Sequence, residues 1–129
     1  MKPVPNLHEA FKDRGIDPDI MPDVSMIPER FQQALLGYYC LMVATEAVNE
    51  GEEPDWKDDD QEKYFAWMKV EEDEEKGSGL GLSLGDVDYY CTLTDVGSRL
   101  SSLSEDAALH LFNTFKDQYE RMMLNPTEK

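Results

Sequence analysis

The residues with the clearest capacity for chemistry are three consecutive aspartates, Asp58, Asp59 and Asp60. Carboxylates at alternate positions resemble the oxygen ligands of an EF-hand calcium loop, but that loop needs glycine at its sixth position and glutamate at its twelfth. This chain has Lys63 and Lys69 there. Because one run of carboxylates supplies too few converging oxygens for a hard cation, the sequence predicts a solvated acidic segment and no metal site.

Glycines invite a second reading, as a phosphate-binding loop. Gly77, Gly79, Gly81 and Gly85 fit neither G-x-G-x-x-G nor the loop that ends in Gly-Lys-Ser/Thr. Glycines inside a strand are usually covered by a neighbouring aromatic side chain or mark a bulge. The sequence therefore predicts strand glycines covered by Phe65 and Trp67, and no nucleotide or other cofactor.

Histidine and cysteine chemistry has few candidates. His8 and His110 are the only imidazoles, and Cys40 and Cys91 have no spacing typical of a metal or redox site. Cys40 lies in the most apolar turn of the chain, where burial raises a thiol's pKa and lowers its reactivity. His110 follows Asp106 by one helical turn, a spacing typical of a surface pair. We therefore expect a protein without enzymatic activity.

Binding residues are more plausible than catalytic ones. Arg99 is a cation in an acid-rich chain, and we expect it to form a structural ion pair with a carboxylate. Aromatic residues flanked by acids resemble the anchors of protein interfaces. The predicted protein-binding residues are Trp56, Tyr64, Trp67, Asp58, Asp59 and Asp60. Trp67 is expected to pack in the core, which leaves Trp56, in a Pro-Asp loop, as the residue to test.

The net charge of −16, from 28 acidic and 12 basic residues, limits the partners. Binding to a phosphate backbone depends on lysine and arginine, so we expect no direct nucleic-acid binding and no contact with anionic membranes. Acidity of this size mainly serves solubility. The alternative is an acidic mimic of nucleic acid that occupies the groove of a DNA-binding host protein.

The cellular compartment follows from apolar patterning. Met1 to Asn6 lacks the apolar stretch of a signal peptide, and the longest apolar run, Ala34 to Ala44, is too short to cross a bilayer. The sequence predicts a cytoplasmic protein with no membrane contact.

The first half of the chain predicts helices. Asn6 and Glu9 form a capping pair that opens a short helix, and Gly15 can close it. Three prolines from 18 to 28 then prevent a continuous helix, so 1–27 is a short helix followed by an irregular connection. The longest apolar periodicity predicts a helix from Pro28 to Glu50, central and covered on two sides.

The second half changes to a two-residue alternation from Tyr64 onward, with Gly85-Asp86 as a turn. Four strands are predicted, at 64–70, 79–85, 87–93 and 98–103. Ser104 then caps a helix that reaches about Leu124, and 125–129 is a frayed tail. The prediction is a single α+β domain, 1–129, in which two long helices pack on one face of an antiparallel sheet of three to four strands.

A resemblance rests on several short motifs in a fixed order. They are Ala47 to Gly51, Pro54-Asp55-Trp56, Lys63 to Met68, the glycine-alternating strand, and Val96 to Leu100. This order resembles a group of small uncharacterised proteins of gut Bacteroides and their phages, with the pattern A-L-N-E-G, P-D-W, K-Y-Y-P-W-F, G-F-G-F-S and V-G-S-R-L. The chain departs from it at Ala66, Leu80 and Leu82, which keep apolar bulk. The resemblance implies a phage-associated setting and no particular activity.

These observations together favour a small protein-interaction module whose site lies between Glu52 and Trp67, with an unidentified protein partner and an open oligomeric state. The mimic of nucleic acid is the first alternative. An enzyme with an unrecognised site is the second, and a deep pocket lined by converging polar groups that include a histidine or Arg99 would favour it.

Overall fold

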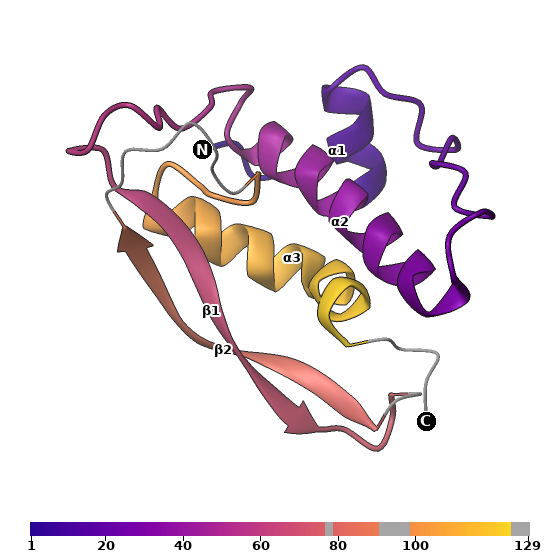
Figure 1. Ribbon diagram of the computed structural model, residues 1–129. Coiled ribbons are helices and arrows are strands. Elements are labelled where there is room, and N and C mark those ends of the chain that lie inside the picture. The colour runs from indigo at the N-terminus through magenta and orange to yellow at the C-terminus, as the bar shows by residue number, and fades with distance from the viewer. Residues whose placement is uncertain (77–78, 91–98, 125–129) are drawn as a thin grey trace.

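The computed structural model describes residues 1–76, 79–90 and 99–124, and across them it shows three helices and one antiparallel hairpin (Figure 1). The predicted α+β class is confirmed. The elements are α1 (Leu7–Asp13), α2 (Glu29–Val48), β1 (Lys63–Glu72), β2 (Leu80–Tyr90) and α3 (Glu105–Met123).

The helices begin where the sequence predicts. The Asn6 side chain accepts a hydrogen bond from the Glu9 amide at 2.9 Å, and the Ser104 hydroxyl accepts one from the Ala107 amide at 3.1 Å. Each cap satisfies an amide that the first turn of a helix leaves without a partner. Gly15, with a φ of +70°, follows the end of α1 in a conformation that suits glycine.

The core lies along both sides of α2. Helix α2 packs against α1 on one side and runs antiparallel to α3 on the other, as Figure 1 shows. Helix α3 buries an apolar stripe that includes Leu111, Phe112, Phe115 and Tyr119. No helix in the described part of the chain is both long and apolar enough to cross a bilayer.

The helix arrangement differs from the expected one. Helix α3 packs against both strands, whereas α2 lies on the far side of α3 from the hairpin (Figure 1). The long helices therefore form successive layers over the hairpin. Two helices side by side on one face were expected because the sequence predicted a sheet of three to four strands. A two-stranded ribbon offers room for one helix.

The predicted turn at Gly85-Asp86 is wrong, because β2 runs through it as one strand. Trp67 pairs with Asp86 and Met68 with Leu84, which leaves Gly85 as the extra residue of a bulge. Residues 87–90 thus belong to β2, and 91–98 lie outside the described residues. Of the predicted fourth strand, Ser102 contributes an isolated bridge to Tyr64.

Trp67 covers the glycine at this bulge. A β-carbon on Gly85 would lie 2.7 Å from Cε3 of the indole, so only glycine fits beneath the ring. The predicted aromatic cover over a strand glycine is confirmed here. The prediction that Trp67 packs in the core is wrong, since its side is the outer face of the hairpin and it is 57% exposed.

Gly81 is covered by a carboxylate instead of an aromatic ring. A β-carbon there would lie 3.1 Å from Oε2 of Glu120, and the same oxygen accepts a hydrogen bond from the Leu82 amide at 2.9 Å. Lys76 neutralises the buried Glu120 at 3.2 Å. The hydrogen bond to Glu120 raises the pKa of Lys76. Glu120 thereby attaches α3 to an edge amide that would otherwise be unpaired.

Alkaline pH should weaken the fold through the hairpin. The hydrogen bond from the Tyr64 hydroxyl to the Glu62 carboxylate raises the pKa of Tyr64 to about 12, and burial raises the pKa of Tyr119. The folded chain keeps these protons, and that of Lys76, at a pH where the unfolded chain releases them. Their contribution to stability is therefore complete below pH about 10 and is lost as pH rises toward 12.

Urea unfolding midpoints measured between pH about 9 and 12 should fall steadily for the native protein. The fall should be shallower for Tyr64→Phe, which removes the phenol bonded to Glu62. Tyr89→Phe is the matched control, because Tyr89 lies opposite Tyr64 in the hairpin with ring centroids 5.8 Å apart. Superimposable pH curves for the native chain and Tyr64→Phe would contradict this account.

Candidate functional site

A cleft of about 550 Å³ opens where the C-terminal end of α2 meets the segments 52–56 and 99–101. Its volume falls within the range of about 300–1,000 Å³ typical of ligand sites. The lining residues are Ile16, Tyr39, Met42, Val43, Thr45, Glu46, Asn49, Glu52, Glu53, Pro54, Trp56, Arg99 and Ser101. The stretch 39–56, residues 99–101 and Ile16 thus meet at one polar and aromatic cleft.

Two buried polar atoms in the lining have no hydrogen-bond partner. Thr45 is 2% exposed and Asn49 is 7% exposed, yet Oγ1 of Thr45 and Oδ1 of Asn49 are unpaired. The two residues are four positions apart, so they lie on the same side of α2. A buried polar atom without a partner costs about 1–3 kcal/mol. Both residues line the cleft, so these two oxygens are the candidates for contact with a polar ligand.

The orientation of the Asn49 amide is fixed by its other end. Its Nδ2 donates to the carbonyl oxygen of Ser101 at 3.1 Å. Since an amide nitrogen can only donate and the carbonyl can only accept, Oδ1 must be the unpaired atom. The unpaired atom is therefore an acceptor, and it belongs to a residue that lines the cleft.

The charged lining residues are mostly acidic. Glu46, Glu52 and Glu53 are exposed, and Glu46 is 3.8 Å from the Arg14 guanidinium. Arg99 is exposed beside them, and no carboxylate of the described residues lies within salt-bridge distance of it. The ion pair expected for Arg99 stays a prediction. Arg99 also lines the cleft, and a pocket that includes Arg99 is the feature expected from the sequence to favour an enzyme.

Trp56 forms the aromatic part of the wall and is half-buried. Behind it lies Lys63, which is 0% exposed and places its Nζ 5.6 Å from the centre of the Trp56 ring. The same ammonium donates to the carbonyl oxygens of Asp58 at 2.7 Å and Gln61 at 3.1 Å. Lys63 therefore joins the acidic turn, the aromatic wall and the first position of β1.

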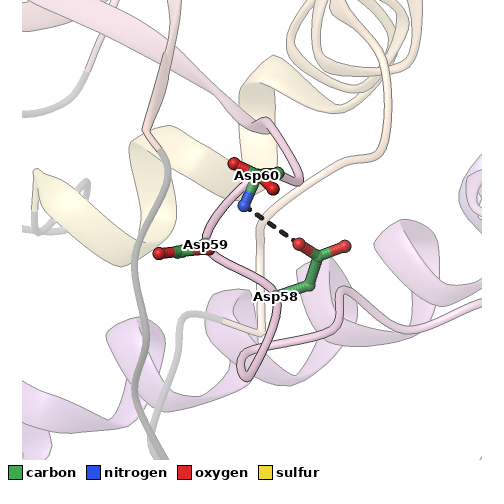
Figure 2. Close-up of side chains that lie close together, drawn as sticks. All are labelled: Asp58, Asp59 and Asp60. Carbon is green, nitrogen blue, oxygen red and sulfur yellow. Dashed lines mark hydrogen bonds between the residues drawn. The ribbon is translucent and has the colours of Figure 1, made fainter.

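The aspartate turn brings three carboxylates together, which is fewer oxygens than a hard cation takes. Figure 2 shows the carboxylate of Asp58 directed at the amide nitrogen of Asp60, a hydrogen bond of 2.9 Å. One oxygen from each of Asp58, Asp59 and Asp60 lies within 4.8 Å of the others, and all three side chains are exposed. Calcium takes six to eight oxygens. The Lys63 ammonium already occupies the Asp58 carbonyl and places a positive charge beside the turn.

The six predicted protein-binding residues lie on three parts of the structure. Trp56 lines the cleft, whereas Tyr64 and Trp67 are on β1 outside the lining. The three aspartates lie on the turn between them. The structure thus separates the predicted surface into a cleft with Trp56 and an exposed hairpin face with Trp67.

Cys40 and His110 have structural roles outside the cleft. Burial raises the pKa of the Cys40 thiol, as expected for its place between α1 and α2. His110 contacts the backbone of Val4, with Nε2 3.0 Å from the amide nitrogen and 3.0 Å from the carbonyl oxygen. It thereby holds the N-terminal segment against α3, and the surface pair expected with Asp106 is replaced by this contact.

Sequence reasoning missed three residues of the site, namely Thr45, Asn49 and Lys63. The available signal was a threonine within the apolar stripe of α2 and an asparagine one turn later. Comparison with known protein families, curated proteins and solved structures finds no match to this chain. The described residues form a small α+β fold that carries a polar cleft with an aromatic wall.

Proposed function

We propose that this chain is a non-enzymatic protein-interaction module that contacts its partner through Glu52 to Trp67 and the adjoining cleft. The observation that carries the proposal is the pair of unpaired buried atoms, Thr45 Oγ1 and Asn49 Oδ1, within a cleft walled by Trp56. Interfaces concentrate their binding energy in partly enclosed aromatic anchors next to polar groups that a partner satisfies.

The enzyme alternative gains one feature and lacks another. The cleft includes Arg99, which the sequence analysis named as a feature that would favour an enzyme. Among the described residues, its lining contains neither histidine nor cysteine, and none of them places a base within hydrogen-bond distance of Thr45 Oγ1. A hydroxyl without a base is a weak nucleophile. The same groups suffice for binding, so binding is the better-supported function.

The cellular setting in this proposal comes from sequence alone. The ordered motifs resemble those of small Bacteroides and phage proteins and suggest a phage- or prophage-associated setting, and the charge of −16 argues against direct contact with nucleic acid. A cytoplasmic location and a host protein as partner fit this setting.

The test is affinity capture from a Bacteroides lysate with matched variants. We expect one partner to be retained by the native chain and lost with Trp56→Ala. Met26→Ala should retain it, because Met26 is 93% exposed and precedes the opposite end of α2. A capture profile unchanged by Trp56→Ala would reject the cleft as the contact site.

The same experiment distinguishes a mimic of nucleic acid from an interaction module. A mimic would return basic DNA-binding proteins, lose them steeply as salt rises, and release them when DNA is added. Capture that depends on Trp56 and persists at high salt would favour the interaction module.

A further inference from the structure

We infer that the cleft receives a protonated nitrogen, the ammonium or guanidinium of a lysine or arginine side chain on the protein partner. This inference rests on the proposed function and specifies the chemistry of its partner. Three features of the cleft support it: the chemistry of its unpaired acceptor, the sign of its charge, and its aromatic wall.

The unpaired acceptor calls for a donor. Asn49 Oδ1 can only accept, and a flip of the amide would lose the 3.1 Å hydrogen bond that Nδ2 donates to the Ser101 carbonyl oxygen. Thr45 Oγ1, on the same side of α2, can accept as well as donate. Ammonium and guanidinium groups carry only donors, several to a group. One such group can satisfy both oxygens.

The charge of the cleft selects for a cation among donors. Glu46, Glu52 and Glu53 line it, against Arg99, and the whole chain carries −16. Arg14 lies 3.8 Å from Glu46 and offsets that carboxylate in part. The remaining acidic residues, in a strongly negative chain, attract a basic side chain and raise its rate of encounter.

Trp56 adds an attraction that neutral donors lack. A cation over an indole ring gains about 0.5–2 kcal/mol from the ring's quadrupole, and Trp56 already has this geometry with Lys63, at 5.6 Å. The cleft walls thus combine an acceptor, acidic groups and a π-surface around a space of about 550 Å³. An anionic ligand could pair with Arg99 only by lying among the three glutamates.

The direct test is an NMR titration that follows the Asn49 side-chain NH₂ and the Trp56 indole N–H. The probes are the N-acetyl N-methylamides of arginine and lysine, of citrulline as the neutral isostere of arginine, and of glutamate. We expect arginine and lysine to shift both signals. Equal shifts with citrulline, larger shifts with glutamate, or no shift with any probe would overturn the inference.

Two variants refine the test. Thr45→Val should raise the urea midpoint of the free protein, since it removes a buried hydroxyl without a partner. It should also lower the affinity for the arginine probe about fivefold, because one hydrogen bond to the probe is lost. Ser102→Ala is the matched control: Ser102 Oγ is also buried and unpaired but is not among the lining residues. It should leave the probe's affinity unchanged.

Glu53→Gln keeps the inference testable if Thr45→Val does not fold, because Glu53 is exposed. This variant should lower the affinity for the arginine probe about two- to threefold at low salt and by less at high salt. Equal affinities for Thr45→Val, Ser102→Ala and the native chain would reject the site. If the probes fail while lysate capture still depends on Trp56, the inference falls and the interaction module stands.

Discussion

Replacing Lys63 with methionine should lower the free energy of unfolding by about 2 kcal/mol and loosen the turn that carries Trp56. Lys63 is fully buried, and its ammonium donates to the carbonyl oxygens of Asp58 and Gln61. Methionine keeps the volume of the apolar stem, so the change removes the charge and both hydrogen bonds. Two charge-assisted bonds are worth about 1.5–3 kcal/mol each, and the desolvation of the ammonium offsets part of this.

The local effect should exceed the global one. The turn before β1 is otherwise held by short-range contacts, such as the amide of Asp55 with Gln61 at 2.6 Å and the amide of Asp60 with Asp58 at 2.9 Å. Lys63, at the first position of β1, links these contacts to the strand. The amide of Asp60 should therefore exchange its hydrogen faster in Lys63→Met than the loss of global stability alone explains.

Lys69→Met is the matched control, since it removes the same charge from an exposed position on the same strand. Urea unfolding followed by circular dichroism should show a small fall in the unfolding midpoint for Lys69→Met and a large fall for Lys63→Met. Equal midpoints for the two variants would mean that the Lys63 ammonium contributes nothing net to the fold. Unchanged exchange at Asp60 would mean that it does not hold the turn.

Local signals in the sequence were sufficient for the helices. Asn6 and Ser104 cap α1 and α3 because a short polar side chain next to an apolar periodic run has one dominant use. The strand start near Tyr64 was equally clear from its two-residue period. These features depend on neighbours within four residues, which is the range that sequence patterns report well.

The bulge at Gly85 shows where local reading fails. Gly85-Asp86 has the composition of a turn, and a turn or a bulge each accommodates a glycine. Only the pairing of Trp67 with Asp86 and Met68 with Leu84, across the hairpin, decides between them. The width of the sheet and the place of α2 followed from that decision, so one ambiguous glycine changed the expected layers.

The cleft was harder to predict than the fold because it joins segments that no periodicity links. Trp56 was identified from its type and its loop, and Arg99 from its charge. Thr45 and Asn49 look ordinary on an otherwise apolar helix, and their meaning lies in oxygen atoms without partners. Hydrogen-bond satisfaction is a property of three-dimensional surroundings, which residue type alone does not carry.

The closest approach of the two long helices predicts the second large effect, at Gly37. A β-carbon there would lie 2.9 Å from the Gln118 carbonyl oxygen and 3.0 Å from the Met122 amide nitrogen. Both are backbone atoms of α3, which cannot turn aside as a side chain can. Gly37→Val must therefore push α2 and α3 apart, and we expect a loss of about 3 kcal/mol.

The separation should also break a polar contact between the helices. Arg121 donates through Nε to Gln33 at 3.0 Å, and its β-carbon lies 3.0 Å from the position of the added carbon. For a domain whose total stability is about 5–15 kcal/mol, a loss of about 3 kcal/mol lowers the melting temperature by about 10 °C. Calorimetry measures this shift directly.

Intrinsic helix propensity, taken alone, predicts that replacing Gly37 with alanine stabilises α2. Alanine is better than glycine inside a helix by about 1 kcal/mol, so any destabilisation by Gly37→Ala must come from contact with α3. Leu35→Val is the matched control for β-branching, since Leu35 is on the same helix and 46% exposed. If Gly37→Ala raised the melting temperature, α2 and α3 would have room between them, and the packing that brings Thr45 and Asn49 to the cleft would need another explanation.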